Sequence, residues 1–476
     1  MIRLALRFAI MLSLSSCAVG PDYKSPKLPV PEIWQGQKPG AVQTIQLQWW
    51  KNFQDPILNR LMTDALASNL DYRLALARIK DLRAQHAATM AAGLPTLDSH
   101  STLSRRFNNT AGASQGGGTS SGGGFGIGNQ TINIFQLGFD AQWELDFFGG
   151  VRRAIEAADA TLEAEVENSR DVLVTLLGDV ARNYIDLRTK QQLLDISHKN
   201  LAAQQDTEQL TKVRQQAGLA TQLEVTEAQA QVAAIQAQLP DYERAIQQAI
   251  YAISVLVGRE PAVLLKRLEQ PSKIPVLTGT VFANLPSELL KRRPDIRRAE
   301  RQMAVATAQI GIATAELYPK INLAAFIGLQ NMSITGFTPI GKSWSASSSI
   351  TMPIFNWGKL NANIKSKQAQ SEQSYIAYQL TILNAFKEVE DALVAGVKEQ
   401  QRHTALTQQV TANRLAVQLA DELYQKGLSG FINVLQNQQT LYQTELSLAS
   451  SVAKLSTTQV ALYKALGGGW KTEVEK

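Results

Sequence analysis

Residues 316 to 329 read ELYPKINLAAFIGL, and two different periodicities meet inside this stretch. Up to Pro319 the sequence follows a helical pattern, and directly after it apolar residues alternate with a second set. Because proline disfavours a helical conformation in the residue before it, here Tyr318, the helix is expected to end at this point. The stretch therefore predicts a helix followed by a strand with one strongly apolar face. That face carries Ile321, Leu323, Ala325, Ile327 and Leu329, and the other carries Asn322, Ala324, Phe326 and Gly328.

The same boundary occurs earlier in the chain, in the sequence AGLPTL at residues 92 to 97. Pro95 corresponds to Pro319, and LDYRLALA (70 to 77) aligns with PDIRRAER (294 to 301) at the same offset. After each hairpin the correspondence resumes, with Gly149 matching Gly358. The sequence therefore predicts an internal duplication, in which each half consists of a helix, a β-hairpin, a very long helix and a further helix.

The pattern divides the chain into six segments. One proline-free helical pattern runs from about Val151 to Gln216 and would span roughly 100 Å at 1.5 Å per residue. Pro240 is expected to kink or break the helix that follows. Helical patterns also cover residues 56 to 93 and 287 to 318. The predicted segments are a signal peptide (1–16), an extended segment (17–55), a first repeat (56–258) with its hairpin at 96–147, a linker (259–286), a second repeat (287–466) with its hairpin at 320–355, and a tail (467–476).

Composition excludes several classes of protein. The chain has 476 residues, of which 45% are hydrophobic and 18% are charged, so wholesale disorder is not expected. The net charge of +6 is small and dispersed, which argues against a nucleic-acid partner. No run of 18 apolar residues occurs, so no transmembrane helix is predicted.

The N-terminus has the pattern of a secretory leader that ends at the only cysteine. Arg3 and Arg7 flank a short apolar stretch, and Leu14-Ser15-Ser16-Cys17 fits a bacterial lipobox. Cys17 is therefore predicted to be lipidated, and the alternative is an unmodified cysteine in an ordinary leader. Ala18, rather than aspartate, follows Cys17, which predicts an anchor in the outer membrane.

The four predicted strands are long enough to cross a bilayer, for which about 9 to 11 residues are needed. Their apolar faces would contact lipid and their polar faces a lumen, with Trp143 and Trp344 at the membrane interface. Four strands cannot close a barrel, and an open edge in lipid leaves backbone groups unpaired. Several chains are therefore expected to pool their strands. The alternatives are a soluble β-sandwich fragment and, for the helices, a coiled-coil rod. The remaining apolar positions assigned to the lipid face are Phe135, Leu137, Phe139, Ala141, Leu145, Ala346, Ile350, Met352 and Ile354.

No enzyme or metal motif is found. The four histidines are scattered, and no His-Glu-x-x-His, Gly-x-Ser-x-Gly or Cys/His spacing occurs. The Gly/Ser-rich stretch at residues 111 to 130 lacks the strand-to-helix context of a phosphate loop and is expected to be a flexible surface loop. The chain is therefore predicted to be a non-enzyme without cofactor or metal.

Four stretches resemble the TolC-type outer-membrane efflux factors, in particular their OprM/NodT-like lipoprotein branch. They are CAVGPDY (17–23), residues 238–261, residues 285–323 and PIFNWG (353–358). The resemblance covers nearly the whole chain and implies an α+β membrane protein that forms a homotrimer. Three chains would build a 12-stranded transmembrane β-barrel, with four strands each, continuous with a periplasmic α-helical barrel. A mixed α/β belt would surround the helices, including the linker and the C-terminus.

The resemblance also implies partners and site residues. A periplasmic adaptor (membrane fusion protein) and an inner-membrane RND pump would deliver substrate, and the adaptor would dock at the two helix turns. Tyr424 would form a periplasmic gate with Glu224. Asn433 and Gln436 stand where related proteins carry rings of aspartates, and Ser429 stands where some carry a basic residue. These departures predict a gate of hydrogen bonds and packing. The docking turns are Ala217, Gly218 and Leu219, and Lys426, Gly427 and Leu428.

The function that follows is a passive, gated conduit for small molecules in a tripartite efflux system. The alternatives are a type I protein-secretion conduit with the same fold and a structural lipoprotein that spans the envelope without transport. Glycine in a tight turn is also explained by backbone geometry alone, so the turn residues carry both a structural and a docking interpretation.

Overall fold

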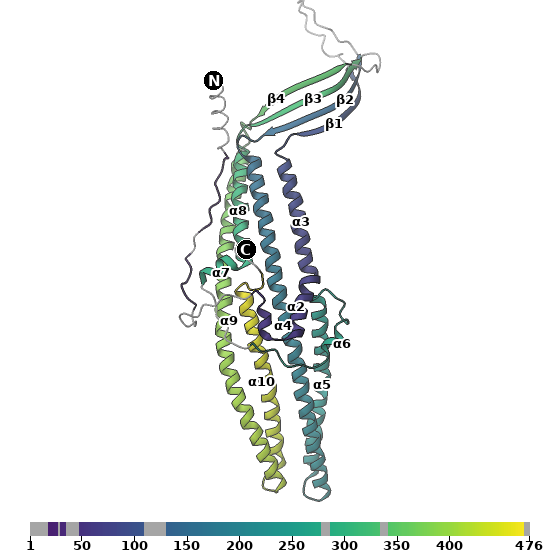
Figure 1. Cartoon of the computed structure of the whole chain (residues 1–476), viewed down its shortest axis with the longest axis vertical. Coiled ribbons are helices and arrows are strands. Elements are labelled where there is room, and N and C mark those ends of the chain that lie inside the picture. The colour runs from purple at the N-terminus through teal and green to yellow at the C-terminus, as the bar shows by residue number, and fades with distance from the viewer. Residues whose placement is uncertain are drawn as a thin grey trace, which may run out of the picture. The chain divides into compact units, whose positions relative to one another are not determined.

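A computed structural model describes residues 18–26, 29–34, 47–108, 130–277, 286–333 and 341–470. The chain folds into two compact units, and each contains segments from both halves of the duplication (Figure 1). Unit 1 comprises Met1–Ser25, Asp81–Leu162 and Arg301–Tyr375, and unit 2 comprises Pro26–Lys80, Glu163–Glu300 and Ile376–Lys476. The predicted Gly/Ser-rich loop lies almost entirely outside the described residues, as do the predicted signal peptide and Cys17.

The duplication is visible in the lengths of the helices. The helices α4 (Gly150–Gln216) and α9 (Lys359–Gln425) each have 67 residues, and each follows a β-hairpin. The helices α5 (Gln222–Leu256) and α10 (Phe431–Ala465) each have 35 residues. The predicted order of helix, hairpin, long helix and further helix is therefore confirmed in both halves.

Unit 1 contains a four-stranded antiparallel sheet in which the two hairpins lie side by side (Figure 1). The strands are β1 (Thr96–Asn108), β2 (Gln130–Leu145), β3 (Lys320–Ser333) and β4 (Lys342–Thr351), in the order β1-β2-β3-β4. The strands β1 and β4 are the two edges. The prediction that the last strand continues to residue 355 is wrong, because β4 ends before Pro353, which has no N–H to donate to a ladder.

The register places the predicted apolar residues on one face of the sheet. Ile327 of β3 pairs with Phe139 of β2 and with Trp344 of β4, so these three side chains lie in one row. Ile327 is 65% exposed and Trp344 is 78% exposed. The opposite face carries mostly polar residues, such as Asn322, which pairs with Glu144. The predicted alternation is therefore confirmed, and its apolar face is uncovered in the described chain.

The helices before the hairpins differ from the prediction at their boundaries. The first helical stretch is divided at Asn69 into α2 (Pro56–Ser68) and α3 (Leu70–Ala91). Asn69 accepts a hydrogen bond from the Tyr72 amide (2.8 Å) and donates to the Leu256 carbonyl (2.8 Å), so its side chain caps α3. The second stretch is divided at Arg293 into α7 (Pro286–Arg292) and α8 (Pro294–Ala315).

In unit 2 the long helices form two helical hairpins, α4–α5 and α9–α10. Pro240 is predicted to kink or break the helix; α5 is not broken there, since it continues through Pro240. Pro240 is exposed, so solvent can hydrogen-bond the carbonyl that the proline leaves without its helical donor. The described parts of the expected mixed α/β belt, residues 259–277 and 286–292, contain the short helices α6 (Leu265–Leu268) and α7. All four described strands belong to the sheet in unit 1, and residues 278–285 of the belt lie outside the described residues, so the belt stays a prediction.

In the part of the chain that the structure describes, no helix combines the length and apolar character needed to cross a membrane.

Candidate gate at the helix turns

The two turns that join the long helices have the same construction. In the first, Gly218 has φ of 75°, and in the second, Gly427 has φ of 74°, so both residues occupy the left-handed region that glycine favours. The Leu219 amide donates to the Arg214 carbonyl (2.8 Å), and the Leu428 amide donates to the Leu423 carbonyl (2.8 Å). Both long helices therefore end in the same capped turn.

Each turn presents a leucine to solvent. Leu219 is 67% exposed and Leu428 is 72% exposed. No atom lies within 4 Å of the position that a Cβ would take on Gly218 or Gly427. The backbone geometry explains why glycine is present, and it leaves Ala217 and Lys426 beside an open surface. The predicted role of these turns in docking stays a prediction.

The predicted pair Tyr424 and Glu224 comes together in unit 2. The Tyr424 hydroxyl of α9 donates to the Glu224 carboxylate of α5, with 3.2 Å between the oxygens. Tyr424 is only 5% exposed and packs with Phe431 and Val434 of α10, and the Phe431 ring centroid lies 5.5 Å from that of Tyr424. Burial, and then the charge of Glu224, raise the pKa of Tyr424. The hydroxyl therefore stays protonated at neutral pH and remains a donor.

A third member of this cluster, Arg214, was missed by the sequence analysis. Its guanidinium carbon lies 4.5 Å from the centroid of the Tyr424 ring, which is a cation–π geometry. It also donates to the Gln425 carbonyl, at 3.4 Å. Arg214 lies in the last turn of α4, and nothing in the local sequence indicates that this turn contacts the end of α9.

The other predicted gate residues do not join this cluster in the single chain. The side-chain amide of Asn433 donates to the Ser429 hydroxyl at 2.9 Å, so these two residues contact each other at the start of α10. Gln436 lies on the exposed surface of α10. The contacts within one chain therefore centre on Tyr424, Glu224 and Arg214.

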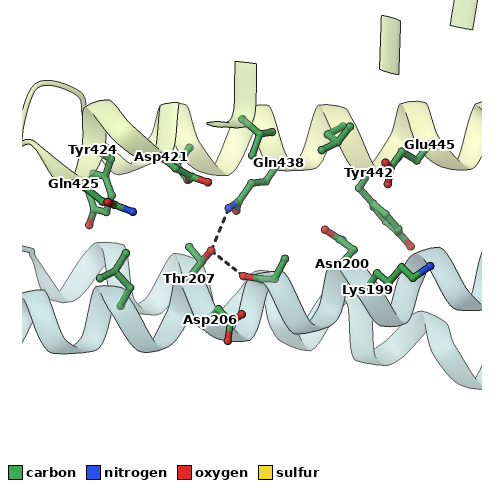
Figure 2. A pocket seen from close by; sticks show the side chains of 15 residues that line it. Lys199, Asn200, Asp206, Thr207, Asp421, Tyr424, Gln425, Gln438, Tyr442 and Glu445 are labelled. Atoms are coloured by element: carbon green, nitrogen blue, oxygen red, sulfur yellow. Dashed lines mark hydrogen bonds between the residues drawn. The ribbon is translucent and has the colours of Figure 1, made fainter. Parts of the chain in front are cut away.

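Next to Tyr424 a groove of about 400 Å³ runs between α4, α9 and α10 (Figure 2). Gln438 of α10 donates to the Thr207 hydroxyl of α4 (3.1 Å), and Gln204 donates to Gln438 (2.9 Å). Farther along, the Ser197 and Tyr442 hydroxyls are 2.9 Å apart. Buried polar pairs therefore hold α4 against α10, and the predicted gate of hydrogen bonds and packing stays a prediction.

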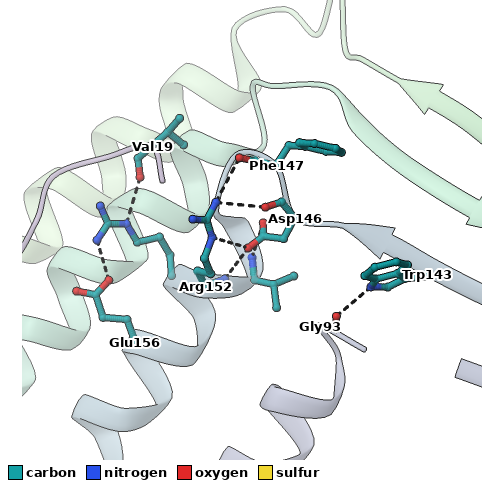
Figure 3. A network of polar contacts seen from close by, with 9 residues as sticks. Val19, Gly93, Trp143, Asp146, Phe147, Arg152 and Glu156 are labelled. Carbon is teal, nitrogen blue, oxygen red and sulfur yellow. Dashed lines mark hydrogen bonds and ion pairs between the residues drawn. The ribbon is translucent and has the colours of Figure 1, made fainter. Parts of the chain in front are cut away.

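In unit 1 a polar network fixes the passage from strand β2 to helix α4 (Figure 3). The Asp146 carboxylate accepts from the Val151 amide (3.1 Å) and the Arg152 amide (2.9 Å), which caps the start of α4. The Trp143 indole donates to the Gly93 carbonyl at 3.0 Å. The Trp143 contact therefore ties β2 to the chain just before the boundary predicted at Pro95.

The first described residues after Cys17 are bound to unit 1. The Val19 amide donates to the Phe148 carbonyl at 3.1 Å. Arg153, with a side chain that is almost fully buried, donates to the carbonyls of Val19 (3.2 Å) and Gly20 (3.2 Å) and to the Asp22 carboxylate (2.7 Å). Hydrogen bonds therefore hold residues 18 to 22 against α4. Cys17 itself lies outside the described residues.

Within the described residues no group of three or more histidine, cysteine or acidic side chains has an arrangement that could hold a metal.

Comparison with solved structures identifies the class of protein to which this fold belongs. The structure resembles the outer-membrane channel OprN with a TM-score of 0.86 and 31% identity, over 95% of this chain and all of that one. It resembles CusC, described as forming a transmembrane channel, with a TM-score of 0.81 and 26% identity over 95% of this chain and all of that one. The fold is that of an outer-membrane channel.

Sequence comparisons are consistent with this class. Nodulation protein T of Rhizobium leguminosarum bv. viciae is 33% identical over 96% of this chain and 92% of its own length. The toluene efflux pump outer membrane protein TtgI of Pseudomonas putida is 33% identical over 97% of each chain. The family model described as outer membrane efflux protein matches residues 61–259 and 285–468. The chain belongs to the outer membrane efflux protein family.

Proposed function

We propose that this chain is the outer-membrane conduit of a tripartite, RND-type efflux system, and that it exports small molecules passively through a gated channel. The observation that carries the proposal is the sheet, because one of its faces is apolar and exposed in the described chain while the other is mostly polar. A face of this kind suits lipid, and the polar face suits an aqueous lumen. The relatives that carry out efflux, such as the toluene efflux pump component, support the same function.

The channel is proposed to be a homotrimer. The edges β1 and β4 have no partner strand in the described chain, and backbone groups in lipid must be paired. Three copies would supply 12 strands. A stripe of exposed apolar residues on α9, formed by Ile376, Leu380 and Leu383 at helical spacing, would be covered by a second copy. A closed ring then satisfies both the sheet edges and this helix face.

The cluster of Tyr424, Glu224 and Arg214 is proposed to be the resting gate. It joins α5, α9 and the end of α4 through the Tyr424–Glu224 hydrogen bond and the Arg214 cation–π contact, and the Tyr424 ring also packs against Phe431 of α10. Opening would require Tyr424 to leave Glu224. The stability of the closed gate would also depend on three neighbouring residues at or near the start of α10, namely Ser429, Asn433 and Gln436.

Partners are proposed on the basis of the exposed turns. Leu219 and Leu428 would offer apolar contacts to a periplasmic adaptor, with Ala217, Gly218, Lys426 and Gly427 around them. The adaptor would connect the channel to the RND pump, which supplies the energy. Lipidation of Cys17 would add an anchor in the outer membrane, next to residues 18 to 22.

The test measures drug susceptibility and the accumulation of dyes and drugs in a strain that lacks this chain. Deletion is expected to increase the accumulation of dyes and drugs, and plasmid-borne wild type is expected to reverse this increase. The matched control is Leu323→Arg, which should fail to complement because it places a charge on the proposed lipid face. Unchanged accumulation of dyes, drugs and metals in the deletion strain would refute an efflux role.

A further inference from the structure

One large apolar residue lies in the middle of the polar face of the sheet. Phe326 of β3 pairs with Asp140 of β2 and Ser345 of β4, so the register places its side chain on the face opposite to Ile327. Phe326 is nevertheless only 8% exposed. Since the neighbouring positions carry small or polar groups, this burial requires an explanation within the sheet itself.

Two glycines provide it. Gly138 of β2 and Gly328 of β3 are directly paired, and both lie on the same face as Phe326. A Cβ built on Gly138 would be 2.5 Å from Phe326 Cε2, and one built on Gly328 would be 2.8 Å from Phe326 Cζ. The ring therefore occupies the space that two side chains would otherwise fill. An aromatic side chain that covers strand glycines in this way also stabilises a sheet.

The space is specific to this position on the strand. Ala324 lies two residues earlier on the same face, and the next pair along the strands from it is Phe326 with Asp140, which both have a Cβ, whereas the next pair from Phe326 is Gly328 with Gly138. A ring at position 324 would find no pair of glycines beneath it. The polar face therefore has one recess suited to an aromatic ring, and Phe326 is placed to fill it.

We propose that the recess formed by Gly138 and Gly328 holds Phe326 flat against the channel wall, so that the ring lines the lumen without narrowing it. The inference rests on the proposed function, because it takes the polar face of the sheet as the wall of the lumen. The Phe326 ring then forms part of the wall of the lumen and leaves the width of the channel unchanged. A channel that exports bulky small molecules keeps its width at this level because two side chains are missing.

The test compares two substitutions by single-channel conductance in planar bilayers. Both are made in the Tyr424→Ala/Glu224→Ala background, so that the resistance of the resting gate contributes less. Phe326→Ala is expected to change conductance by less than about a tenth, because a ring that lies flat obstructs little of the pore. Ala324→Phe, the matched control on the same strand, is expected to lower conductance clearly, because its ring would stand in the lumen. Phe326→Trp is expected to lower it as well, since the indole exceeds the recess.

Each outcome decides a different point. An increase in conductance for Phe326→Ala comparable to the decrease for Ala324→Phe would show that the ring projects, which overturns the inference. No effect of Ala324→Phe would show that this face does not line the conduction path, which overturns it too. Absence of any channel in wild type and background would instead count against the proposed function. Substitution of either glycine is avoided, because a Cβ on Gly328 would lie 2.3 Å from the Leu137 carbonyl oxygen and would disturb strand pairing.

Discussion

The proposed gate at Tyr424 would close without a salt bridge. The Tyr424 hydroxyl is a neutral donor to the Glu224 carboxylate, and its ring lies beneath the Arg214 guanidinium. A hydrogen bond to a charged group contributes about 1.5 to 3 kcal/mol, and a cation–π contact adds about 0.5 to 2 kcal/mol. Energies of this size are small enough for the proposed gate to open reversibly when the proposed adaptor docks.

The gate pair is tested by the conductance of the resting channel. Tyr424→Ala combined with Glu224→Ala removes the hydrogen bond and the buried ring, so the resting channel is expected to conduct more than wild type. Gln436→Ala is the matched control, since Gln436 is exposed and lies outside the contact cluster. A double variant that opens no further than wild type would place the gate elsewhere.

Arg214 is tested separately, because its role depends on shape as well as charge. Arg214→Lys keeps the positive charge but loses the planar group that stacks on the ring. Resting conductance is expected to rise for both Arg214→Lys and Arg214→Ala, and to rise more for Arg214→Ala. Equal conductance of Arg214→Ala and wild type would show that the cation–π contact does not hold the gate.

Sequence reasoning located part of this site and missed the rest for a physical reason. Tyr424 and Glu224 stand at positions that the family resemblance indicates, and the glycine turns are visible from backbone preference. Arg214 is different, because its role depends on the packing of the end of α4 against α9. Such a contact between distant segments leaves no periodicity or motif in either one.

At the level of the elements, the alternating strands were the most predictable feature. A period of two residues determines which side chains share a face once the register is known. Helix boundaries were less predictable. The break at Asn69 depends on a tertiary hydrogen bond to Leu256, and Arg293 ends α7 while donating to Glu388 (2.7 Å) and to the Ala465 carbonyl (2.9 Å).

The facing of the sheet is tested with two neighbouring substitutions on β3. Leu323→Arg would place a charge on the proposed lipid face, where an arginine costs about 2 to 4 kcal/mol near the bilayer midplane. Asn322→Arg would place the same charge on the polar face, opposite Glu144, and is expected to be tolerated. The measurement is the yield of assembled protein in the outer membrane, and equal yields for both variants would reject the assigned facing.

The contacts of Arg153 with the N-terminal segment, residues 18 to 22, give a further prediction. Arg153→Met removes the donors that bind Val19, Gly20 and Asp22, so residues 18 to 22 should detach from α4. Trypsin is then expected to cleave after the exposed Lys24 faster than in wild type, as followed by mass spectrometry.

Arg83→Met is the matched control, because Arg83 is an exposed arginine of unit 1 on α3. Identical cleavage rates at Lys24 for Arg153→Met, Arg83→Met and wild type would show that the Arg153 contacts do not hold the segment.

At the scale of the whole molecule, duplication is the organising feature. Each half contributes one hairpin to the sheet in unit 1 and one helical hairpin to unit 2. The sequence reveals this repeat directly, because matching residues recur at one offset before the hairpins and at a second offset after them. The sequence of one chain does not reveal how many copies assemble, since the surfaces proposed to cover the open sheet edges and the apolar stripe on α9 belong to other chains.

The mass of the intact assembly decides whether several copies pool their strands. In the proposed trimer three copies close the sheet, so full-length protein extracted from the outer membrane in mild detergent should give three chains per particle by native mass spectrometry. The Leu323→Arg variant should give far fewer such particles. A wild-type protein that is uniformly monomeric under the same conditions would refute the proposed trimer.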